Sequence, residues 1–266
     1  MVGFAVLVGV ALVYPNNLFS FPSVLGFFTG FFISGFSMVL NDYYDIEVDS
    51  INMPDRLLPS KKLSPNFAIT LALILLFVGI FLSYLTSFYN FVIAISFAFI
   101  AWLYNSWGKR KGIIGNFMVA ASVSIPYIYG SLIFGFSEDL LLLWLVLTSF
   151  LAATGREIVK TISDIVGDEL RNVMSIARVY GPKSASIFSS MLFLMSVIVS
   201  WFPFFTGLVG IFYALFMLIP SIIFIYSSIK ILNFPSKLNA LHVKNISLLG
   251  MLLGLIAFLI GGLTFL

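Results

Sequence analysis

Long apolar runs without any charge dominate this sequence. Residues 21–40, FPSVLGFFTGFFISGFSMVL, contain no Asp, Glu, Lys or Arg, and about 18–20 such residues are enough for a helix to cross a bilayer. The chain as a whole is 61% hydrophobic and 9% charged, with a mean hydropathy of +1.10. Soluble domains average roughly 45–50% apolar and 25% charged residues. The sequence therefore predicts an all-α integral membrane protein.

Apolar segments bounded by polar or turn residues give the expected number of helices. Nine are expected, near residues 1–14, 21–44, 65–87, 90–107, 113–135, 139–162, 184–204, 207–232 and 245–265. The first is short for a complete crossing. It lacks a basic start and a small-residue cleavage site, so it is interpreted as a membrane helix rather than a signal peptide.

The basic residues predict how these helices are oriented. All 14 Lys and Arg residues lie at 45–66, 108–112, 163–183 and 233–244 or at the adjoining helix ends, and the opposite loops have none. Excess Lys and Arg mark cytoplasmic loops. We therefore expect a multi-pass protein of the cell membrane with a cytoplasmic N-terminus and its charged face in the cytoplasm.

Composition also excludes several kinds of site. The chain has no cysteine, which rules out disulfides and thiolate metal sites. The net charge of +3 and the pI near 9.0 are accounted for by the cytoplasmic loops, so no nucleic-acid partner is expected.

Acidic residues gather in two segments of this charged face. Asp42, Asp45, Glu47, Asp49 and Asp55 follow the second helix, and Glu157, Asp164, Asp168 and Glu169 follow the sixth. Within the segments, Asn41, Asp45 and Asp49 are spaced i, i+4, i+8, and Asp164 and Asp168 are spaced i, i+4. If the helices continue, each set shares one helix face.

Such clusters are unfavourable unless a cation is bound. Carboxylates at i, i+4 repel one another, and the C-terminal end of a helix is the wrong end of its dipole for an anion. Hard oxygen ligands without His or Cys select Mg²⁺, Ca²⁺ or Mn²⁺, and Mg²⁺ commonly bridges a few carboxylates to phosphates. Two facing acidic clusters could thus hold a diphosphate through metal; the alternative is a solvated, charged interface loop.

Three segments together resemble a known family. NDYYDIEVDSINMPDRLLPS, residues 41–60, is similar to the first aspartate motif of UbiA-type membrane prenyltransferases. REIVKTISDIVGDE, residues 156–169, resembles their second motif, and LYNSWGKRKGIIGN, residues 103–116, resembles the segment after their fourth helix. Within that family the second segment is most similar to archaeal digeranylgeranylglyceryl phosphate synthases.

The resemblance implies a fold, an activity and a cofactor. It implies one domain over residues 1–266, with nine helices around a central cavity, that uses Mg²⁺ and a prenyl diphosphate donor. The family members it most resembles transfer a geranylgeranyl group from geranylgeranyl diphosphate to geranylgeranylglyceryl phosphate, a lipid-phosphate acceptor, in ether-lipid synthesis. Membrane lipids are the remaining expected partners.

The resemblance also implies roles for individual residues. The expected metal ligands are Asn41, Asp42, Asp45, Asp49, Asp164 and Asp168, among which Asp45, Asp49 and Asp168 are counted as catalytic. The expected diphosphate contacts are Asn52, Arg56, Lys109, Arg110, Arg156 and Lys160. Tyr104 either stabilises developing positive charge through its ring or anchors its helix at the interface.

Several alternatives stay open at this point. Asp42 can face away from the metal, and Arg156 can pair with Glu157 instead of binding substrate. Thr161 and Ser163 stand where family members often carry acids, which leaves the second half of the metal site less certain in composition. An extra cationic pocket for an acceptor phosphate could come from residues 61, 62, 171 or 178.

Other functions predict different features. An aromatic prenyltransferase acting on 4-hydroxybenzoate or a quinone ring would use the same metal site. A CDP-alcohol phosphotransferase would need Asp-Gly and Ala-Arg between its acids, and neither pair stands near these motifs. A divalent-cation transporter would place acids near the bilayer midplane, whereas these lie at helix ends.

Overall fold

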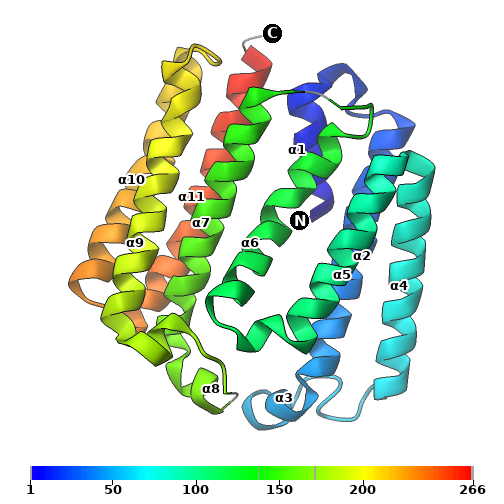
Figure 1. Cartoon of the computed structure of the whole chain (residues 1–266), viewed down its shortest axis with the longest axis vertical. Helices are drawn as coiled ribbons and strands as arrows, with labels where there is room; N and C mark the ends of the chain where they lie inside the picture. Colours follow the sequence, from blue (N-terminus) through cyan, green and yellow to red (C-terminus); the bar gives the residue numbers. More distant parts are fainter. Residues whose placement is uncertain (1, 137, 171, 265–266) are drawn as a thin grey trace.

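The computed structural model of the chain describes residues 2–136, 138–170 and 172–264, apart from the side chains of Asn52 and Leu170. Within these residues every regular element is a helix, and the long helices stand side by side in one bundle (Figure 1). The expected fold class, an all-α membrane protein, is therefore confirmed.

The bundle contains long helices and short connecting ones. The first half of the chain supplies α1 (Val2–Val13), α2 (Phe21–Tyr44), α4 (Pro65–Thr86), α5 (Phe88–Ser106) and α6 (Ile113–Ser131). The second half supplies α7 (Leu140–Ser163), α9 (Ile176–Phe205), α10 (Ile211–Asn233) and α11 (Lys237–Thr264). The connections contain the 3-10 turns η1 (Pro15–Asn17) and η2 (Gly108–Arg110) and the short helices α3 (Ile46–Asn52) and α8 (Ile165–Leu170).

The nine expected segments correspond to the nine long elements. In the described part of the chain, eight helices are long and apolar enough to cross a membrane, and α1 is the shorter ninth. Two predicted starts were wrong. The segment expected at 184–204 begins at Ile176, because α9 continues through a kink at Gly181, where φ is 86°. The segment expected at 245–265 begins at Lys237, because the helix extends past its apolar part.

Small residues allow the helices of the first half to pack closely. A Cβ on Gly130 of α6 would lie 2.0 Å from the carbonyl oxygen of Val6 in α1, so the two backbones are in contact. Gly30 of α2, the second glycine of the GFFTG segment, lies against Gly3 of α1. Glycine pairs at this spacing typically mark packing faces of membrane helices.

In the second half, the helix interface is built from serines. The buried face of α9 carries Ser186, Ser189, Ser190, Ser196 and Ser200, and the hydroxyl of Ser190 donates to the carbonyl of Ser228 in α10 over 3.2 Å. Such hydroxyls donate hydrogen bonds to helix carbonyls, and the small serine side chains allow neighbouring helices to approach each other closely. Large apolar side chains such as Phe77 and Ile222 are exposed on the outside, as expected for a surface that contacts lipid chains.

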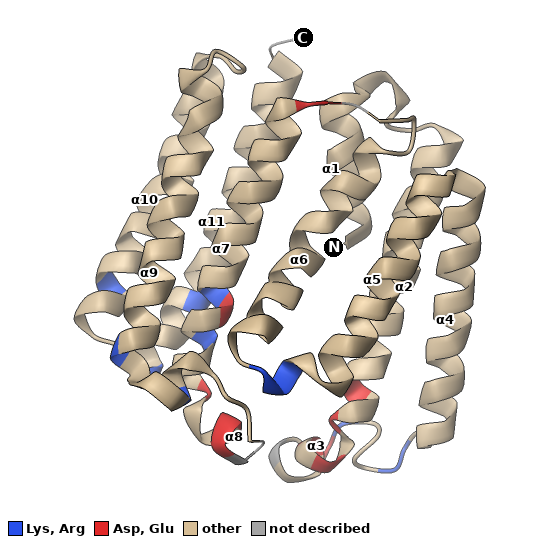
Figure 2. Ribbon diagram, viewed as in Figure 1, with Lys and Arg blue, Asp and Glu red and all other residues tan. Residues whose placement is uncertain are grey.

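The charged residues gather at one end of this bundle. Lys, Arg, Asp and Glu lie mostly at the end that carries α3 and α8, and an acidic turn before α7 lies at the opposite end (Figure 2). Helix α1 runs from the middle of the bundle toward the end opposite α3 (Figure 1). The helix ends and connections that carry both acidic motifs therefore meet at the same end.

Candidate active site

Each acidic motif lies where a long helix breaks and a short helix begins. Helix α2 ends at Tyr44, and Asp45 leaves helical geometry with φ −96° and ψ 3° before α3 starts. Helix α7 ends in the same way at Asp164, with φ −109° and ψ 11°. The predicted i, i+4 spacing survives both breaks, since the amide of Asp49 donates to Asp45 and that of Asp168 to Asp164, each over 2.8 Å.

These breaks correct one argument made from the sequence. The carboxylates were expected at helix C-termini, the unfavourable end of the dipole. Asp49 instead lies in the first turn of α3 and Asp168 in the first turn of α8. The first turn is where a helix dipole favours negative charge. The dipole penalty therefore applies to Asp42, Asp45 and Asp164 and not to Asp49 and Asp168.

Asn41 and Asp45 share one cation, the ammonium group of Lys109. Lys109 Nζ donates to Asn41 Oδ1 over 3.2 Å and forms an ion pair with Asp45 Oδ2. Asn41 Nδ2 also donates to Asp45 Oδ2 over 3.1 Å. Lys109 belongs to η2, which follows α5, so this contact joins the first acidic motif to the basic segment 108–112.

Asp42 and Asp49 contact a different cation, Arg56. The guanidinium of Arg56 lies 2.7 Å from Asp49 Oδ2 and 3.4 Å from Asp42 Oδ1. The hydrogen bond and charge of Asp49 raise the pKa of Arg56 above its ordinary value. Together with Asp55 these three side chains line a pocket against α4. Asp42 thus turns away from Asn41, as one of the open alternatives suggested.

The second acidic motif lines a separate polar pocket. Its lining joins α5, η2, α6, α7 and the start of α9, and its polar members are Tyr104, Lys109, Asn116, Glu157, Lys160, Thr161, Asp164, Asp168 and Ser175. Ser163 Oγ donates to Asp164 Oδ1 over 2.9 Å. Because Lys109 lines this pocket and also contacts Asn41 and Asp45, it connects the two motifs.

The side chains at this end fit a hard divalent cation in chemical type. Asn41 and Asp45 already enclose an ammonium group between their oxygens, and Asp164 and Asp168 place carboxylates in the adjoining pocket. Among the described residues, no three His, Cys, Asp or Glu side chains converge into one metal-binding group. The structure therefore shows two groups of oxygen ligands, Asn41 with Asp45 and Asp164 with Asp168, whose described side chains do not surround a single metal position.

The remaining predicted phosphate contacts are distributed unevenly. Lys160 lines the polar pocket with its Nζ 3.6 Å from Glu157 Oε2. Arg156 pairs with Glu157 over 2.6 Å and donates to the Lys244 carbonyl over 3.3 Å, so it ties α7 to α11. Arg110 is exposed, and the side chain of Asn52 lies outside the described residues.

The described candidates for an acceptor-phosphate pocket lie in two different segments. Lys61 and Lys62 are exposed in the connection before α4. Arg178 donates to the carbonyl of Val173 over 3.0 Å, and Arg171 lies outside the described residues.

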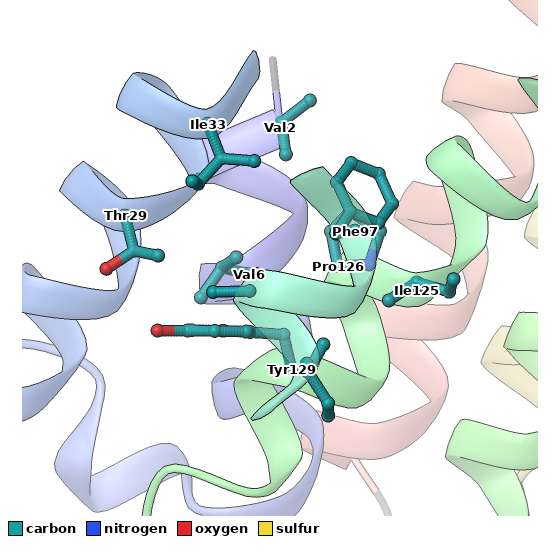
Figure 3. Close-up of a pocket in the computed structure, with 11 residues that line it drawn as sticks. Val2, Val6, Thr29, Ile33, Phe97, Ile125, Pro126 and Tyr129 are labelled. Carbon is teal, nitrogen blue, oxygen red and sulfur yellow. The ribbon is translucent and has the colours of Figure 1, made fainter. Parts of the chain in front are cut away.

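An apolar pocket lies deeper in the bundle, between α1, α2, α5 and α6. It is lined by residues such as Val6, Ile33, Phe97 and Pro126, with the ring of Tyr129 across it and the Tyr129 hydroxyl directed toward α2 (Figure 3). Proline inside a membrane helix leaves a carbonyl unpaired and bends the helix, which helps to form a cavity. Pro220 of α10 lines another internal pocket in the second half.

Sequence reasoning missed two residues of the polar pocket. Asn116 ends the segment 103–116, in which only Tyr104 and basic residues were predicted site residues. Ser175 is a single serine before a helix. The Gly-Asn pair at 115–116 was a usable signal for the first. No pattern in the sequence distinguishes Ser175 from the other serines of the chain.

The comparisons with known proteins agree on one family. The sequence model of the UbiA prenyltransferase family matches residues 2–249. The digeranylgeranylglyceryl phosphate synthase of Methanococcus vannielii is 36% identical over 264 residues, covering 98% of this chain and 93% of the relative.

Solved structures give the same result. A structure of digeranylgeranylglyceryl phosphate synthase aligns with a TM-score of 0.85 and 32% identity, covering 99% of this chain and 93% of that one. A UbiA homolog from Archaeoglobus fulgidus, solved bound to GPP and Mg²⁺, aligns with a TM-score of 0.70 and 18% identity, covering 97% of this chain and 95% of that one. At that identity the likeness shows a shared fold.

Proposed function

Because this chain belongs to the UbiA prenyltransferase family, we propose that it transfers a geranylgeranyl group from geranylgeranyl diphosphate to the free hydroxyl of geranylgeranylglyceryl phosphate. Relatives that carry the name of this activity match nearly the full length of the chain. The reaction breaks the bond between the prenyl carbon and the diphosphate oxygen, and the diphosphate leaves with the electron pair. The acceptor oxygen then bonds to that carbon and loses its proton.

One observation carries the proposal, the position of Lys109 between the two aspartate motifs. Its ammonium contacts Asn41 and Asp45 of the first motif and lines the pocket that holds Asp164 and Asp168 of the second. A diphosphate in this pocket would meet Lys109 and Lys160, whose ammonium groups can donate charge-assisted hydrogen bonds to phosphate oxygens. The two motifs therefore adjoin one anion-binding position.

The oxygen ligands suit Mg²⁺, held by Asn41, Asp45, Asp164 and Asp168. When bound, Mg²⁺ would supply the positive charge that stabilises the departing diphosphate. Arg56 engages Asp49 Oδ2, so a ligand role for Asp49 would fall to its other carboxylate oxygen. Tyr104 lines the same pocket, where its ring can stabilise positive charge that develops on the prenyl carbon.

The location of the site in the membrane follows from its charge. The site lies at the charged end of the bundle (Figure 2), and Lys and Arg prefer cytoplasmic loops. We place the active site at the cytoplasmic face, where water-soluble phosphate groups have access while the prenyl chains remain among apolar helices.

The direct test is an assay with purified protein, geranylgeranyl diphosphate and Mg²⁺. We expect an ether product with geranylgeranylglyceryl phosphate, and loss of turnover by about a hundredfold to a thousandfold in Asp45→Ala and Asp168→Ala, as for other groups that act on transition-state charge. Glu138→Ala is the matched control, because Glu138 is an exposed acid at the opposite end of the bundle.

Three results would contradict the proposal. Transfer to 4-hydroxybenzoate or a quinone ring, without any ether product, would replace the lipid acceptor by an aromatic one. Full activity in both aspartate variants would remove the two motifs from the reaction, and metal uptake into liposomes without prenyl transfer would indicate a transporter.

A further inference from the structure

The polar pocket has a second group of hydrogen-bond donors besides its lysines. One wall of the pocket forms where residues 108–112 meet residues 172–175. The amide of Met174 donates to the carbonyl of Arg110 over 3.1 Å, and Gly112 lies so close that a Cβ would be 2.0 Å from the Met174 carbonyl oxygen. This junction places Ser175 and Asn116 beside Lys109 on the pocket wall.

Ser175 has a hydroxyl group that nothing in its own helix uses. The residue is 1% exposed and immediately precedes α9, where serine normally accepts a hydrogen bond from the helix start. Here the side chain makes no such cap, and Ser175 Oγ has no hydrogen-bond partner among the described residues. Buried polar atoms are nearly always paired, so this lone hydroxyl in a pocket wall indicates a ligand.

Asn116 adds a second donor of the same kind. It lies in the first turn of α6, where its amide nitrogen donates to the carbonyl of Gly112 over 3.1 Å. Its side-chain Nδ2 is buried and, in the described part of the chain, has no partner. Two neutral donors with unused hydrogens thus line the pocket that also contains Lys109 and Lys160.

The combination of donors identifies the chemistry of the ligand. Hydroxyl, carboxamide and ammonium groups together donate to an oxyanion, and a phosphate has enough acceptor oxygens to use several of them. Asp164, Asp168 and Glu157 in the same pocket would repel an anion that came alone. The ligand therefore fits a phosphate that arrives with a divalent cation.

We propose that Ser175 and Asn116 hold a phosphate group in this pocket by donating hydrogen bonds to its oxygens. The inference rests on the proposed prenyl transfer, which involves two phosphate-bearing substrates. The phosphate can be the diphosphate of the prenyl donor or the phosphate of the lipid acceptor, because both present the same oxygens.

The test measures binding directly, apart from turnover. Isothermal titration of the full-length protein with inorganic pyrophosphate, and separately with glycerol phosphate, in the presence of Mg²⁺ gives the two affinities. We expect Ser175→Ala to weaken one of them by about 10-fold to 100-fold, as for loss of a hydrogen bond to a charged group. Asn116→Ala should weaken the same one, and the double variant should weaken it further.

Stability in the absence of ligand separates this role from a structural one. Because Ser175 Oγ caps nothing and bonds nothing, Ser175→Ala should leave the thermal midpoint unchanged or raise it. A helix cap would instead lose stability on the same change. Ser186→Ala is the control, since Ser186 is a fully buried serine of the same helix that donates to the carbonyl of Lys183 over 2.7 Å and does not line the pocket.

Each outcome has a definite meaning. Weaker pyrophosphate binding assigns the site to the prenyl donor, and weaker glycerol phosphate binding assigns it to the acceptor. Unchanged affinity for both probes, a fall in the midpoint of Ser175→Ala, or a wild-type protein that binds neither probe would overturn the inference. If prenyl transfer occurs but Ser175→Ala binds normally, the inference fails and the proposed function stands.

Discussion

At the scale of single residues, the sequence predicted that the two acidic motifs lie at one charged end of the bundle, but not the partners of their side chains. Asp45, Asp49, Asp164 and Asp168 were selected because carboxylates at helix spacing repel one another unless a cation is bound, and Asn41 because it shares their spacing and the family motif. The contact of Lys109 with Asn41 joins residues 68 positions apart, and spacing along one helix carries no information about such a pair. The pairing of Asp49 with Arg56, seven residues later, was not predicted either, because Arg56 was expected to contact the diphosphate.

The position of Lys109 leads to a prediction about metal affinity. Its ammonium contacts the same oxygens of Asn41 and Asp45 that a metal ion would use, so the two cations compete. We expect Lys109→Gln to bind Mg²⁺ more tightly without substrate by roughly tenfold, the factor that corresponds to about 1.4 kcal/mol. Turnover should fall at the same time, because the variant loses a donor to the diphosphate.

Titration calorimetry with Mg²⁺ and an initial-rate assay measure these opposite effects. Lys111→Gln is the matched control, since Lys111 is exposed and lies over the ring of Trp107. Equal Mg²⁺ affinity in Lys109→Gln and in the wild type would show that Lys109 does not compete for those oxygens.

At the scale of elements, apolar runs predicted the membrane-spanning helices but not where every helix begins. Hydropathy marks the part of a helix that lies in lipid, and α11 begins several residues earlier, at Lys237. The segment after the kink at Gly181 was predicted, but not the helical residues from Ile176 that precede the kink. Helices α2 and α7 end within one residue of their predicted ends, whereas the short helices α3 and α8 that follow them were not predicted.

The junction between residues 108–112 and 172–175 can be tested through Gly112. Its φ is +56°, and an added Cβ would meet the Met174 carbonyl oxygen at 2.0 Å. We expect Gly112→Ala to destabilise the protein by roughly 1–3 kcal/mol, the usual cost of such backbone strain. Activity should also fall, because residues 108–112 would move away from residues 172–175 in the pocket wall.

Gly167→Ala is the control for this experiment. Gly167 lies inside α8 with nothing within 4 Å of an added Cβ, so alanine should be neutral or stabilise by roughly 0.5–1 kcal/mol. Thermal unfolding in detergent compares the two variants. Equal midpoints would show that residues 108–112 and 174 are not held as closely as the structure describes.

At the scale of the whole molecule, the partition of charge was the most informative sequence feature. A complete separation of loops with Lys and Arg from loops without them predicted that segments far apart in the chain share one end of the bundle, and Figure 2 shows that they do. The same partition could not show which helices are neighbours, because lipid-facing and buried apolar residues look alike in sequence. Contacts such as α7 with α9 and α1 with α6 depend instead on small residues.

The orientation of the bundle in the membrane can be measured without background, because the chain has no native cysteine. Lys62 is exposed in the connection between α3 and α4, and Phe19 is 89% exposed in the connection between α1 and α2 at the opposite end. We expect a membrane-impermeant maleimide to label Phe19→Cys in intact cells and Lys62→Cys only after permeabilisation, since basic loops remain in the cytoplasm.

Both variants should retain prenyl transfer, because neither residue belongs to the polar pocket that contains Lys109, Asp164 and Asp168. Labelling of Lys62→Cys in intact cells, with Phe19→Cys protected, would invert the orientation and place the phosphate site outside. The cytoplasmic placement would then have to be abandoned, although the pairing of the two aspartate motifs within the bundle would be unaffected. The labelling pattern therefore tests the membrane orientation separately from the fold.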